Sequence, residues 1–374
     1  MLTLGFDAKR ALYNTTGLGN YARTHLGNLL TYHSEHAYHG FAPRKNKRQP
    51  QATWSPIQEH PSMQVHLDPS PWANLKRSLA LRQNLQAKGI QVYHGLSNEI
   101  PLDLQGTGIR TVITIHDLLF LDYPQTYPWL DRQIYRLKTQ AGLAKADRVV
   151  AISQTTRDRI LHYFPSLQNR IDVIYQPCSS TYYRDPWSDP GNMEGITTQP
   201  YWLYVGTIET RKNLLGLLRA MSTLLPQERL PLVVIGRGGR HAQVCQQLGH
   251  QNGLDIRWMP DFRGDLRAWY QGATALLYPS QAEGFGLPVA EALLSGCPVM
   301  TSKGTSMAEF SGEWSITVDP ASIPSMAEGL RQTLKPSPHH HRVQARWAML
   351  QILDPIQITQ QWISLYQELA SLPF

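Results

Sequence analysis

Apolar positions along the chain form short runs that alternate with longer stretches of helical periodicity. In the first half the runs predict strands at 2–6, 91–94, 111–115, 148–152 and 172–175. In the second half they predict strands at 202–206, 232–236, 256–259, 275–278, 299–302 and 316–318. Helical stretches lie between them, for example at 19–32 and 130–146. This alternation is typical of parallel sheets with helices on both faces, so the sequence predicts an α/β fold.

A segment rich in proline, glycine and aspartate divides this alternation into two halves. It runs from Asp185 to Pro200 and has no periodicity, which predicts a linker at 186–200. We therefore expect two Rossmann-like domains, at 1–185 and 201–355, followed by a C-terminal helix within 356–374. Ligands of such sheets bind at the carboxyl ends of the strands, so a central cleft between the domains is the expected active site.

The composition is that of a globular protein, with 42% hydrophobic and 17% charged residues. Cys178, Cys245 and Cys297 are widely spaced and odd in number, which predicts free thiols in a reducing compartment. The N-terminal apolar run is too short for a signal peptide. No apolar stretch approaches the roughly 18 residues that a membrane span needs. These features predict a cytoplasmic protein.

The formal net charge of +7 is compatible with anionic partners. Basic residues cluster at 44–48 and along a predicted helix at 74–89, where we interpret Leu75, Leu79 and Leu85 as core contacts. We interpret both clusters as solvated surface. The alternative is contact with an anionic membrane surface at the inner face of the cell membrane, or with a lipid-linked acceptor. Nucleic acid is not expected, because the basic residues are not interleaved with aromatic ones.

Two carboxylates, Glu283 and Glu291, stand eight residues apart around a glycine-rich turn. The turn follows a predicted strand and leads into a helix, since Pro288 suits a first helical turn and Gly296 suits a helix end. Helix-start N–H groups favour anions, and carboxylates can hold sugar hydroxyls. The segment therefore predicts a nucleotide-sugar site.

A second loop supports this prediction. It begins at Gly206, after the strand at 202–206, and carries Arg211 and Lys212 before an apolar helix that starts at residue 214. Asn213 is a plausible N-cap of that helix. Two cations beside helix-start N–H groups form a site for a diphosphate. An ordinary capped helix with solvated basic residues is the alternative for this loop taken alone.

The two loops, with their Arg-Lys pair and E-x7-E spacing, resemble the donor site of the retaining glycosyltransferases of family 4 (GT4), which have the GT-B fold. The resemblance extends over residues 1–365 and includes 15–21, 92–95 and 112–117. It is nearest to the bacterial mannosyltransferase-like branch, in which a His-Asp pair follows a strand. It implies that the C-terminal helix crosses back to the N-terminal domain.

The resemblance also implies roles for individual residues. Glu291 is expected to bind the ribose hydroxyls. Glu283 and the backbone N–H groups of Phe285, Gly286 and Leu287 are expected to face the sugar and the β-phosphate.

In the N-terminal half, His116 is expected to lie against the donor sugar near the transferred carbon, and Asp117 to orient its loop. Gly17 and Gly19 would let the backbone approach the phosphate or the acceptor. His94 has a weaker claim and stays outside the catalytic set. Glu309 matches a family position near the donor.

The expected reaction breaks the bond between the anomeric carbon and a phosphate oxygen, with retention of configuration and no assigned covalent intermediate. The sequence has no Asp-x-Asp motif, so we expect no metal and no cofactor, with Arg211 and Lys212 stabilising the departing diphosphate. We interpret the histidines at 336–341 as part of a solvated loop. GDP-mannose is the favoured donor, other nucleotide sugars stay open, and the acceptor is expected to be a glycan or a lipid-linked glycan.

Two other classes stay open at this point. One is a catalytically silent subunit that binds a nucleotide sugar. The other is an epimerase or phosphorylase with the GT-B fold.

Overall fold

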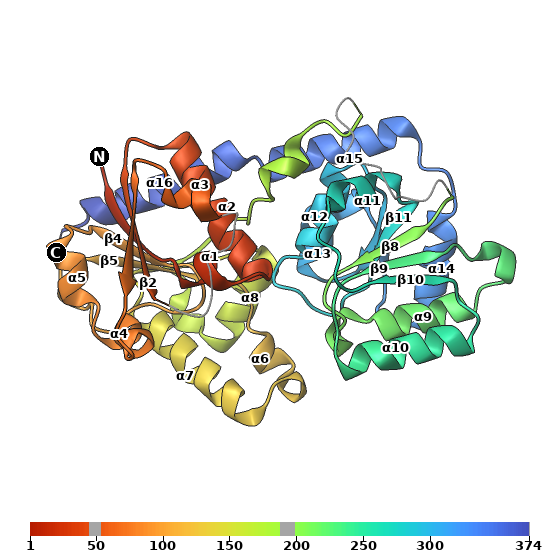
Figure 1. The fold of residues 1–374 in the computed structure, drawn as a ribbon, viewed down its shortest axis with the longest axis horizontal. Helices are drawn as coiled ribbons and strands as arrows, with labels where there is room; N and C mark the ends of the chain where they lie inside the picture. The colour runs from red at the N-terminus through yellow and green to blue at the C-terminus, as the bar shows by residue number, and fades with distance from the viewer. Residues whose placement is uncertain (45–53, 188–198, 374) are drawn as a thin grey trace. The chain divides into compact units, whose positions relative to one another are not determined.

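We describe the chain from a computed structural model, whose described residues are 1–44, 54–187 and 199–373. The chain divides into two compact units, each built on its own parallel sheet (Figure 1). The first unit comprises Met1–Pro177 and Leu353–Phe374, and the second comprises Cys178–Ile352. The boundaries thus fall after Pro177 and Ile352, rather than after residues 185 and 355. The predicted linker at 186–200 falls largely on 188–198, outside the described residues.

The sheet of the first unit has the strand order β3-β2-β1-β4-β5-β6-β7, and all neighbouring strands are parallel. Its strands are β1 (Thr3–Asp7), β2 (Ala37–Pro43), β3 (Met63–Asp68), β4 (Val92–Gly95), β5 (Arg110–Ile115), β6 (Arg148–Ala151) and β7 (Ile171–Val173). The order reverses between β1 and β4, which is where ligands of such sheets bind.

Helices cover both faces of this sheet because its central strands are apolar on both sides. One face carries α1 (Lys9–Tyr13), α2 (Gly17–Tyr32), α3 (Ser55–Gln58) and α16 (Pro355–Ser371). The other face carries α4 (Ala73–Leu79), α5 (Arg82–Ala87), α6 (Leu119–Asp122), α7 (Trp129–Lys145) and α8 (Gln154–Tyr163).

The C-terminal helix α16 packs against α2 and β4 of the first unit. Its Tyr366 hydroxyl lies 2.7 Å from Nδ1 of His94 and 3.2 Å from Nε2 of His25. Trp362 stacks on His94 with 4.6 Å between ring centroids. The last helix is therefore fixed to the core by buried polar contacts as well as by apolar packing.

The sheet of the second unit has the order β10-β9-β8-β11-β12-β13 and is also parallel. Its strands are β8 (Trp202–Val205), β9 (Leu232–Ile235), β10 (Ile256–Met259), β11 (Ala275–Tyr278), β12 (Val299–Ser302) and β13 (Ile316–Val318). Here the order reverses between β8 and β11.

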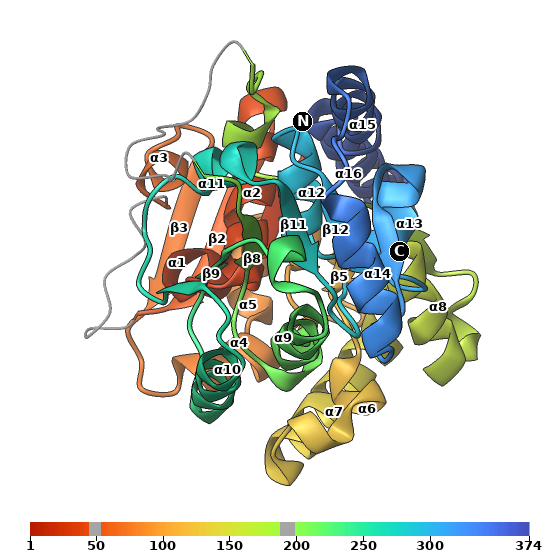
Figure 2. The same ribbon diagram turned by 90° about the vertical axis from the view of Figure 1, so that its right-hand side faces the viewer.

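The helices of the second unit also lie on both faces of its sheet, as Figure 2 shows from the side of this unit. One face carries α9 (Leu214–Ser222), α10 (Arg240–Gln251) and α14 (Ile323–Thr333). The other carries α11 (Leu266–Gly272), α12 (Leu287–Leu294), α13 (Ser306–Ser311) and α15 (His339–Ile352).

The predicted α/β class is confirmed, and every predicted strand is found. Strands β2 and β3 were not predicted. The predicted helix at 74–89 is two helices, α4 and α5, and in α4 the predicted core residues Leu75 and Leu79 are exposed, whereas Leu85 of α5 is buried. Most of the basic cluster at 44–48 lies outside the described residues. Among the described residues, no helix is both long and apolar enough to cross a membrane.

Candidate functional site

The candidate donor site lies at the carboxyl edge of the second sheet, where the strand order reverses. Strands β8 and β11 are parallel neighbours, so the loops that follow them leave the sheet side by side. The loop after β8 carries Arg211 and Lys212, and the loop after β11 carries Glu283. This is the position at which parallel sheets of this type bind ligands.

The loop after β8 depends on two glycines. Gly206 has φ +147°, and a Cβ atom there would lie 3.2 Å from Nζ of Lys212. A Cβ atom at Gly236, after β9, would lie 1.9 Å from the carbonyl oxygen of Gly206. Glycine at both positions therefore lets the two loops touch and leaves room for the Lys212 ammonium.

Asn213 occupies the N-cap position of α9, but its side chain does not cap the helix. The residue is left-handed, with φ 57°, and its Nδ2 donates a 2.7 Å hydrogen bond to the carbonyl of Pro320. The expected side-chain cap is therefore wrong. The asparagine instead ties the loop to the segment after β13.

Four side chains converge at this edge. Nη1 of Arg211 lies 3.0 Å from Oε1 of Glu283, and Nζ of Lys212 lies 3.6 Å from the same oxygen. The Tyr278 hydroxyl accepts a 2.9 Å hydrogen bond from Lys212 and donates one of 2.9 Å to Glu283. Arg211 also donates to the carbonyl of Ala282. The geometry thus brings three of the predicted catalytic residues together.

The electrostatics of this cluster favour an anion. Burial alone would raise the pKa of Glu283, but Lys212 and Arg211 outweigh burial and hold that pKa below its ordinary value. Glu283 is therefore a carboxylate near neutral pH. The side chain of Glu209 is more than half exposed and lies 3.5 Å from Arg211. The two cations face one buried carboxylate, so an excess of positive charge is directed to the site.

The glycine-rich loop before α12 is shaped by close packing. Gly286 has φ +96° at the helix start, and a Cβ atom there would lie 2.2 Å from Cγ of Met307. Ser306, at the start of α13, donates hydrogen bonds to the carbonyls of Glu283 and Phe285. Ser306 therefore fixes the loop from the side of α13, and Leu287 begins the helix that follows the loop.

Phe285 contributes its backbone to this loop and its side chain to the core. Its ring is buried and stacks on Phe310 with 4.7 Å between centroids. Glu309, one residue before Phe310 on α13, lies in the helix that supports the loop. Its predicted position near the donor stays a prediction.

Glu291 lies on α12 and is partly buried rather than exposed. Its Oε2 accepts a 3.0 Å hydrogen bond from the Tyr270 hydroxyl. Burial raises the pKa of Glu291 to about 7, although hydrogen bonds from Tyr270 and Tyr182 act in the opposite direction. About half of the protein molecules would thus carry a protonated Glu291 near pH 7. The expected contact between Glu291 and the ribose hydroxyls stays a prediction.

His116 follows β5 at the carboxyl edge of the first sheet. Its Nε2 donates a 2.8 Å hydrogen bond to the carbonyl of Leu96, and burial lowers its pKa to about 4. The ring is therefore neutral near pH 7, with Nδ1 as its remaining acceptor. The Asn98 side chain holds the segment after β5 in place, because its Oδ1 accepts a hydrogen bond from the backbone N–H of His116 and its Nδ2 donates one to the carbonyl of Asp117. The catalytic role of His116 stays a prediction.

The remaining predicted residues of the first unit differ in their surroundings. Gly17 and Gly19 lie in the first turn of α2, which begins two residues before the predicted helix at 19–32, and a short helix α1 that was not predicted precedes it. A Cβ atom at Gly19 would lie 2.0 Å from the carbonyl oxygen of Asn14, whereas Gly17 faces open space. His94 is buried and forms hydrogen bonds with Thr114 and Tyr366, and its exclusion from the catalytic set stays a prediction.

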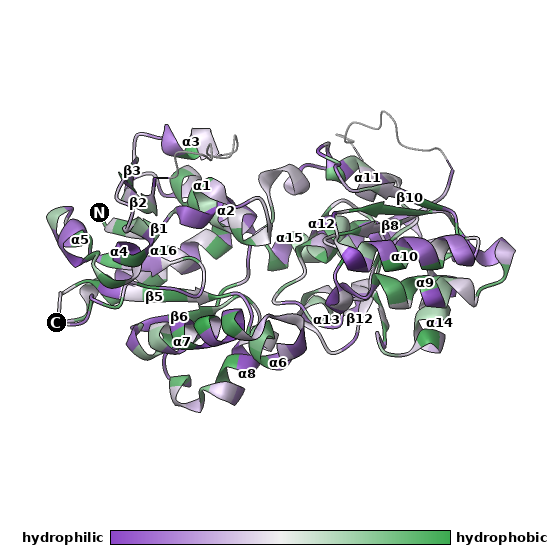
Figure 3. Cartoon of the chain, turned by 60° about the horizontal axis from the view of Figure 1, so that its bottom comes forward, coloured by the Kyte–Doolittle hydropathy of each residue, from purple (hydrophilic) through white to green (hydrophobic). Residues whose placement is uncertain are grey.

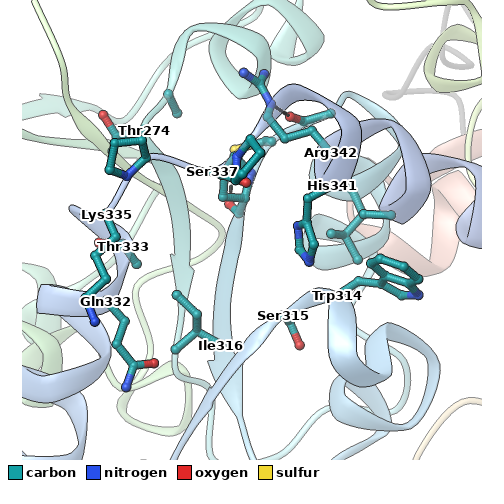
Figure 4. Close-up of a pocket in the computed structure, with 18 of the residues that line it drawn as sticks. Thr274, Trp314, Ser315, Ile316, Gln332, Thr333, Lys335, Ser337, His341 and Arg342 are labelled. Atoms are coloured by element: carbon teal, nitrogen blue, oxygen red, sulfur yellow. Dashed lines mark hydrogen bonds between the residues drawn. The ribbon is translucent and has the colours of Figure 1, made fainter.

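A separate hollow of about 520 Å³ lies in the second unit, near the amino ends of β11 to β13 (Figure 4). Thr274, Trp314, His341 and Arg342 line it. The histidines at 339–341 begin helix α15 and do not lie in a loop, but His339 and His340 are exposed to solvent as predicted. The hollow is at the edge of the sheet opposite to Arg211 and Glu283, and it takes no part in the candidate donor site.

Comparison with solved structures defines the class of the fold. The chain matches HepE from Anabaena, solved in complex with UDP and glucose, with a TM-score of 0.76 over 98% of this chain and 100% of that one, at 16% identity. Two such parallel α/β units form the GT-B fold. Residues 16–179 match the family model described as "Glycosyltransferase Family 4", and residues 192–346 match the one described as "Glycosyl transferases group 1". The chain belongs to glycosyltransferase family 4.

Curated relatives match over part of their length. O-antigen chain mannosyltransferase B from Escherichia coli is 33% identical over 256 residues, which cover 65% of this chain and 65% of the relative. O-antigen chain mannosyltransferase RfbU from Salmonella typhimurium is 25% identical over 251 residues, covering 66% of this chain and 65% of the relative. The alignments therefore span about two thirds of each of these relatives.

Several residues of the site carry no signal in the sequence motifs. Tyr278 and Ser280 both donate to Glu283, at 2.9 and 3.1 Å, and Tyr270 donates to Glu291. Tyr278 is the last residue of a predicted strand, at the carboxyl edge of the sheet, and this position could have indicated that its side chain lies near the site. The others come close to the motif carboxylates only through the fold.

Proposed function

We propose that the chain is a retaining hexosyltransferase that moves mannose from GDP-mannose to a glycan or lipid-linked acceptor in cell-surface polysaccharide synthesis. The observation that carries this proposal is the cluster of Arg211, Lys212 and Glu283 at the β8 and β11 edge. Its excess of positive charge suits the diphosphate of a nucleotide sugar.

The reaction breaks the bond between the anomeric carbon and the β-phosphate oxygen. The electron pair leaves with the diphosphate, the acceptor oxygen forms the new bond on the same face of the sugar, and its proton is released. Arg211 and Lys212 would stabilise the charge on the leaving group, and the nearby helix starts would add partial positive charge. With these groups in place, the proposed mechanism uses no metal. Glu283 would stabilise positive charge on the sugar ring.

The donor assignment has a different kind of support. Both relatives compared above are named as mannosyltransferases, which favours mannose. The HepE structure contains UDP and glucose, so a uridine donor is the alternative that a test must separate.

A thermal-shift panel of GDP, GDP-mannose, UDP and UDP-glucose, with and without EDTA, tests the donor. A ligand that binds only the folded protein raises its stability by mass action. We expect selective stabilisation by the guanosine ligands, unchanged by EDTA. Selective stabilisation by the uridine ligands would overturn the donor, and no stabilisation by any of them would overturn the site.

Incubation with GDP-mannose and a membrane-lipid extract then tests transfer. We expect acceptor-dependent release of GDP and a mannosylated product with the same anomeric configuration as the donor. Binding of the donor without any release of GDP would instead indicate a silent binding subunit.

A further inference from the structure

Helix α7 of the first unit leaves a row of large apolar side chains uncovered. Leu130, Ile134 and Leu137 recur at intervals of four and three residues, which places them on one face of the helix. Their exposed fractions are 62%, 41% and 66%, and Trp129 at the helix start is 67% exposed. Single exposed apolar residues are ordinary, but a continuous row along one helix indicates an interaction surface.

The opposite face of α7 is firmly packed, so the helix cannot turn its apolar row inward. Thr139, Gly142 and Leu143 are buried on that side. A Cβ atom at Gly142 would lie 2.7 Å from Cδ1 of Ile113, so the helix backbone lies directly against strand β5. Figure 3 shows that hydrophobic and hydrophilic residues alternate along the length of α7.

A second apolar patch lies on α4, and side chains of α4 and α7 both bind the carboxylate of Glu99. Arg77 points inward from α4 and pairs with Glu99, and Lys138 of α7 donates a 3.1 Å hydrogen bond to the same side chain. The outward side of α4 exposes three large apolar residues. They are Trp72, Leu75 and Leu79.

The charges around these two patches have one predominant sign. Helix α7 carries four basic residues, Arg132, Arg136, Lys138 and Lys145, and one acidic residue, Asp131. Helices α4 and α5 add further basic residues and no acidic ones. The exposed ones are Lys76 and Arg82, whereas Arg77 is buried and points inward. An apolar face bordered by cations is complementary to an anionic lipid surface, because long basic side chains can reach phosphates while apolar side chains enter the interface.

We propose that the α7 face, together with the outward side of α4, docks the first unit on an anionic phospholipid membrane. Leu130, Ile134, Leu137 and Trp129 enter the headgroup region, and the flanking cations contact lipid phosphates. A second copy of the chain fits this surface less well, since association would bring two positively charged borders together. The inference does not depend on the proposed transferase activity, because it concerns binding in the absence of any donor.

Flotation of the full chain with vesicles tests the proposal. One set of vesicles contains phosphatidylcholine with phosphatidylglycerol, and the other contains phosphatidylcholine alone. We expect binding to the first set, weakened by salt, and little binding to the second. The double variant Leu130→Gln, Leu137→Gln should bind the anionic vesicles at least about tenfold more weakly, because it removes apolar area that would enter the interface.

The double variant Leu225→Gln, Val244→Gln is the matched control, since it polarises two exposed apolar residues in the second unit. It should bind like the parent chain. Arg136→Gln should weaken binding to the anionic vesicles and reduce the salt dependence of that binding. It provides a second test of the same surface if the leucine variant does not fold.

Three results would overturn the proposal. The first is a parent chain that does not float with anionic vesicles, and the second is a leucine variant that binds as well as the control. The third is a dimer in light scattering that the leucine variant abolishes, because the face would then join two copies of the chain.

Discussion

Tyr278 donates a 2.9 Å hydrogen bond to Glu283 from the end of strand β11. The same hydroxyl accepts a hydrogen bond of 2.9 Å from Lys212, so it bridges a cation and a carboxylate that lie 3.6 Å apart. Both charged groups thus have a fixed place before a ligand arrives. Charge that is already oriented lowers the cost of stabilising a transition state.

Tyr278→Phe should remove this bridge and keep the packing of the ring. Lys212 and Glu283 each lose one hydrogen bond in a largely buried site, which should lower the free energy of unfolding by about 1–3 kcal/mol. We expect kcat to fall by roughly tenfold or more, with a smaller change in the KM for the donor, because the charges stay present but lose their alignment. Steady-state kinetics and urea denaturation measure both effects.

Tyr204→Phe is the matched control. Tyr204 lies on β8 with its ring centroid 6.2 Å from that of Tyr278, and within the described chain its buried hydroxyl has no hydrogen-bond partner. Its removal should leave activity unchanged and stability equal or higher. Equal losses of activity in the two variants would contradict a specific role for the Tyr278 hydroxyl.

Lys212→Ala should reduce transfer severely. A charge-assisted contact to the departing diphosphate contributes about 1.5–3 kcal/mol, which corresponds to a roughly ten- to hundredfold loss in kcat/KM. Arg219→Ala, on the exposed side of α9, removes a cation from the helix that follows and should have little effect. Unchanged activity in Lys212→Ala would remove Lys212 from the mechanism.

Glu291 should make stability depend on pH in the opposite direction to an ordinary paired carboxylate. Burial raises its pKa to about 7, against an ordinary value of 4.5. Between these two pH values the folded protein holds a proton that the unfolded chain has released. The free energy of unfolding should therefore fall as the pH rises through this window, by up to about 3 kcal/mol, and this contribution should level off above pH 7.

Glu291→Gln isolates this contribution, because glutamine can still accept the hydrogen bond from Tyr270 but does not titrate. Denaturant unfolding of the parent and the variant at pH 5, 6, 7 and 8 gives a difference in stability at each pH. The variant should gain relative to the parent as the pH rises. A difference that is constant over the whole range would show that Glu291 is not a proton-binding group of the folded state in this window.

Periodicity predicted the second unit better than the first. Strands β10, β11, β12 and β13 begin and end at the predicted residues, because each is a short, mainly apolar run with clear turn residues around it. Strand β2 was missed because Pro43 and Gly40 interrupt its apolar pattern. Strand β3 was missed because the prediction relied on continuous apolar runs, whereas the residues of this strand alternate between apolar and polar.

Motifs identified the charged residues of the site but not their neighbours. Arg211, Lys212 and Glu283 follow strands that the sequence already placed in a parallel sheet. Tyr278 bridges Glu283, five residues further along the chain, and Lys212, 66 residues before it, and spacing along one segment cannot express the second contact. Leu75 and Leu79 were assigned to the core because an apolar pattern does not reveal that one of the two buried residues of α4 is an arginine.

That buried arginine gives the last prediction. Arg77 pairs with Asp7, at the end of β1, and with Glu99, after β4, and all three side chains are largely buried. Arg77→Ala would remove the cation that Asp7 and Glu99 share and leave Glu99 paired with Lys138 alone, which should cost about 3–5 kcal/mol of unfolding free energy at pH 7. Arg82→Ala, on the exposed start of α5, should cost far less.

The pH dependence of this loss separates the ion pair from simple packing. Burial acts to raise the pKa of Glu99, but Arg77 and Lys138 outweigh it and hold that pKa below its ordinary value of 4.5. The ion pair therefore stabilises the fold above that pH, and its contribution is lost as the pH falls through the lowered value. The stability difference between parent and Arg77→Ala should shrink when urea unfolding is repeated at pH 4. A difference as large at pH 4 as at pH 7 would indicate that the packing of the arginine side chain, rather than its charge, fixes helix α4 to the sheet.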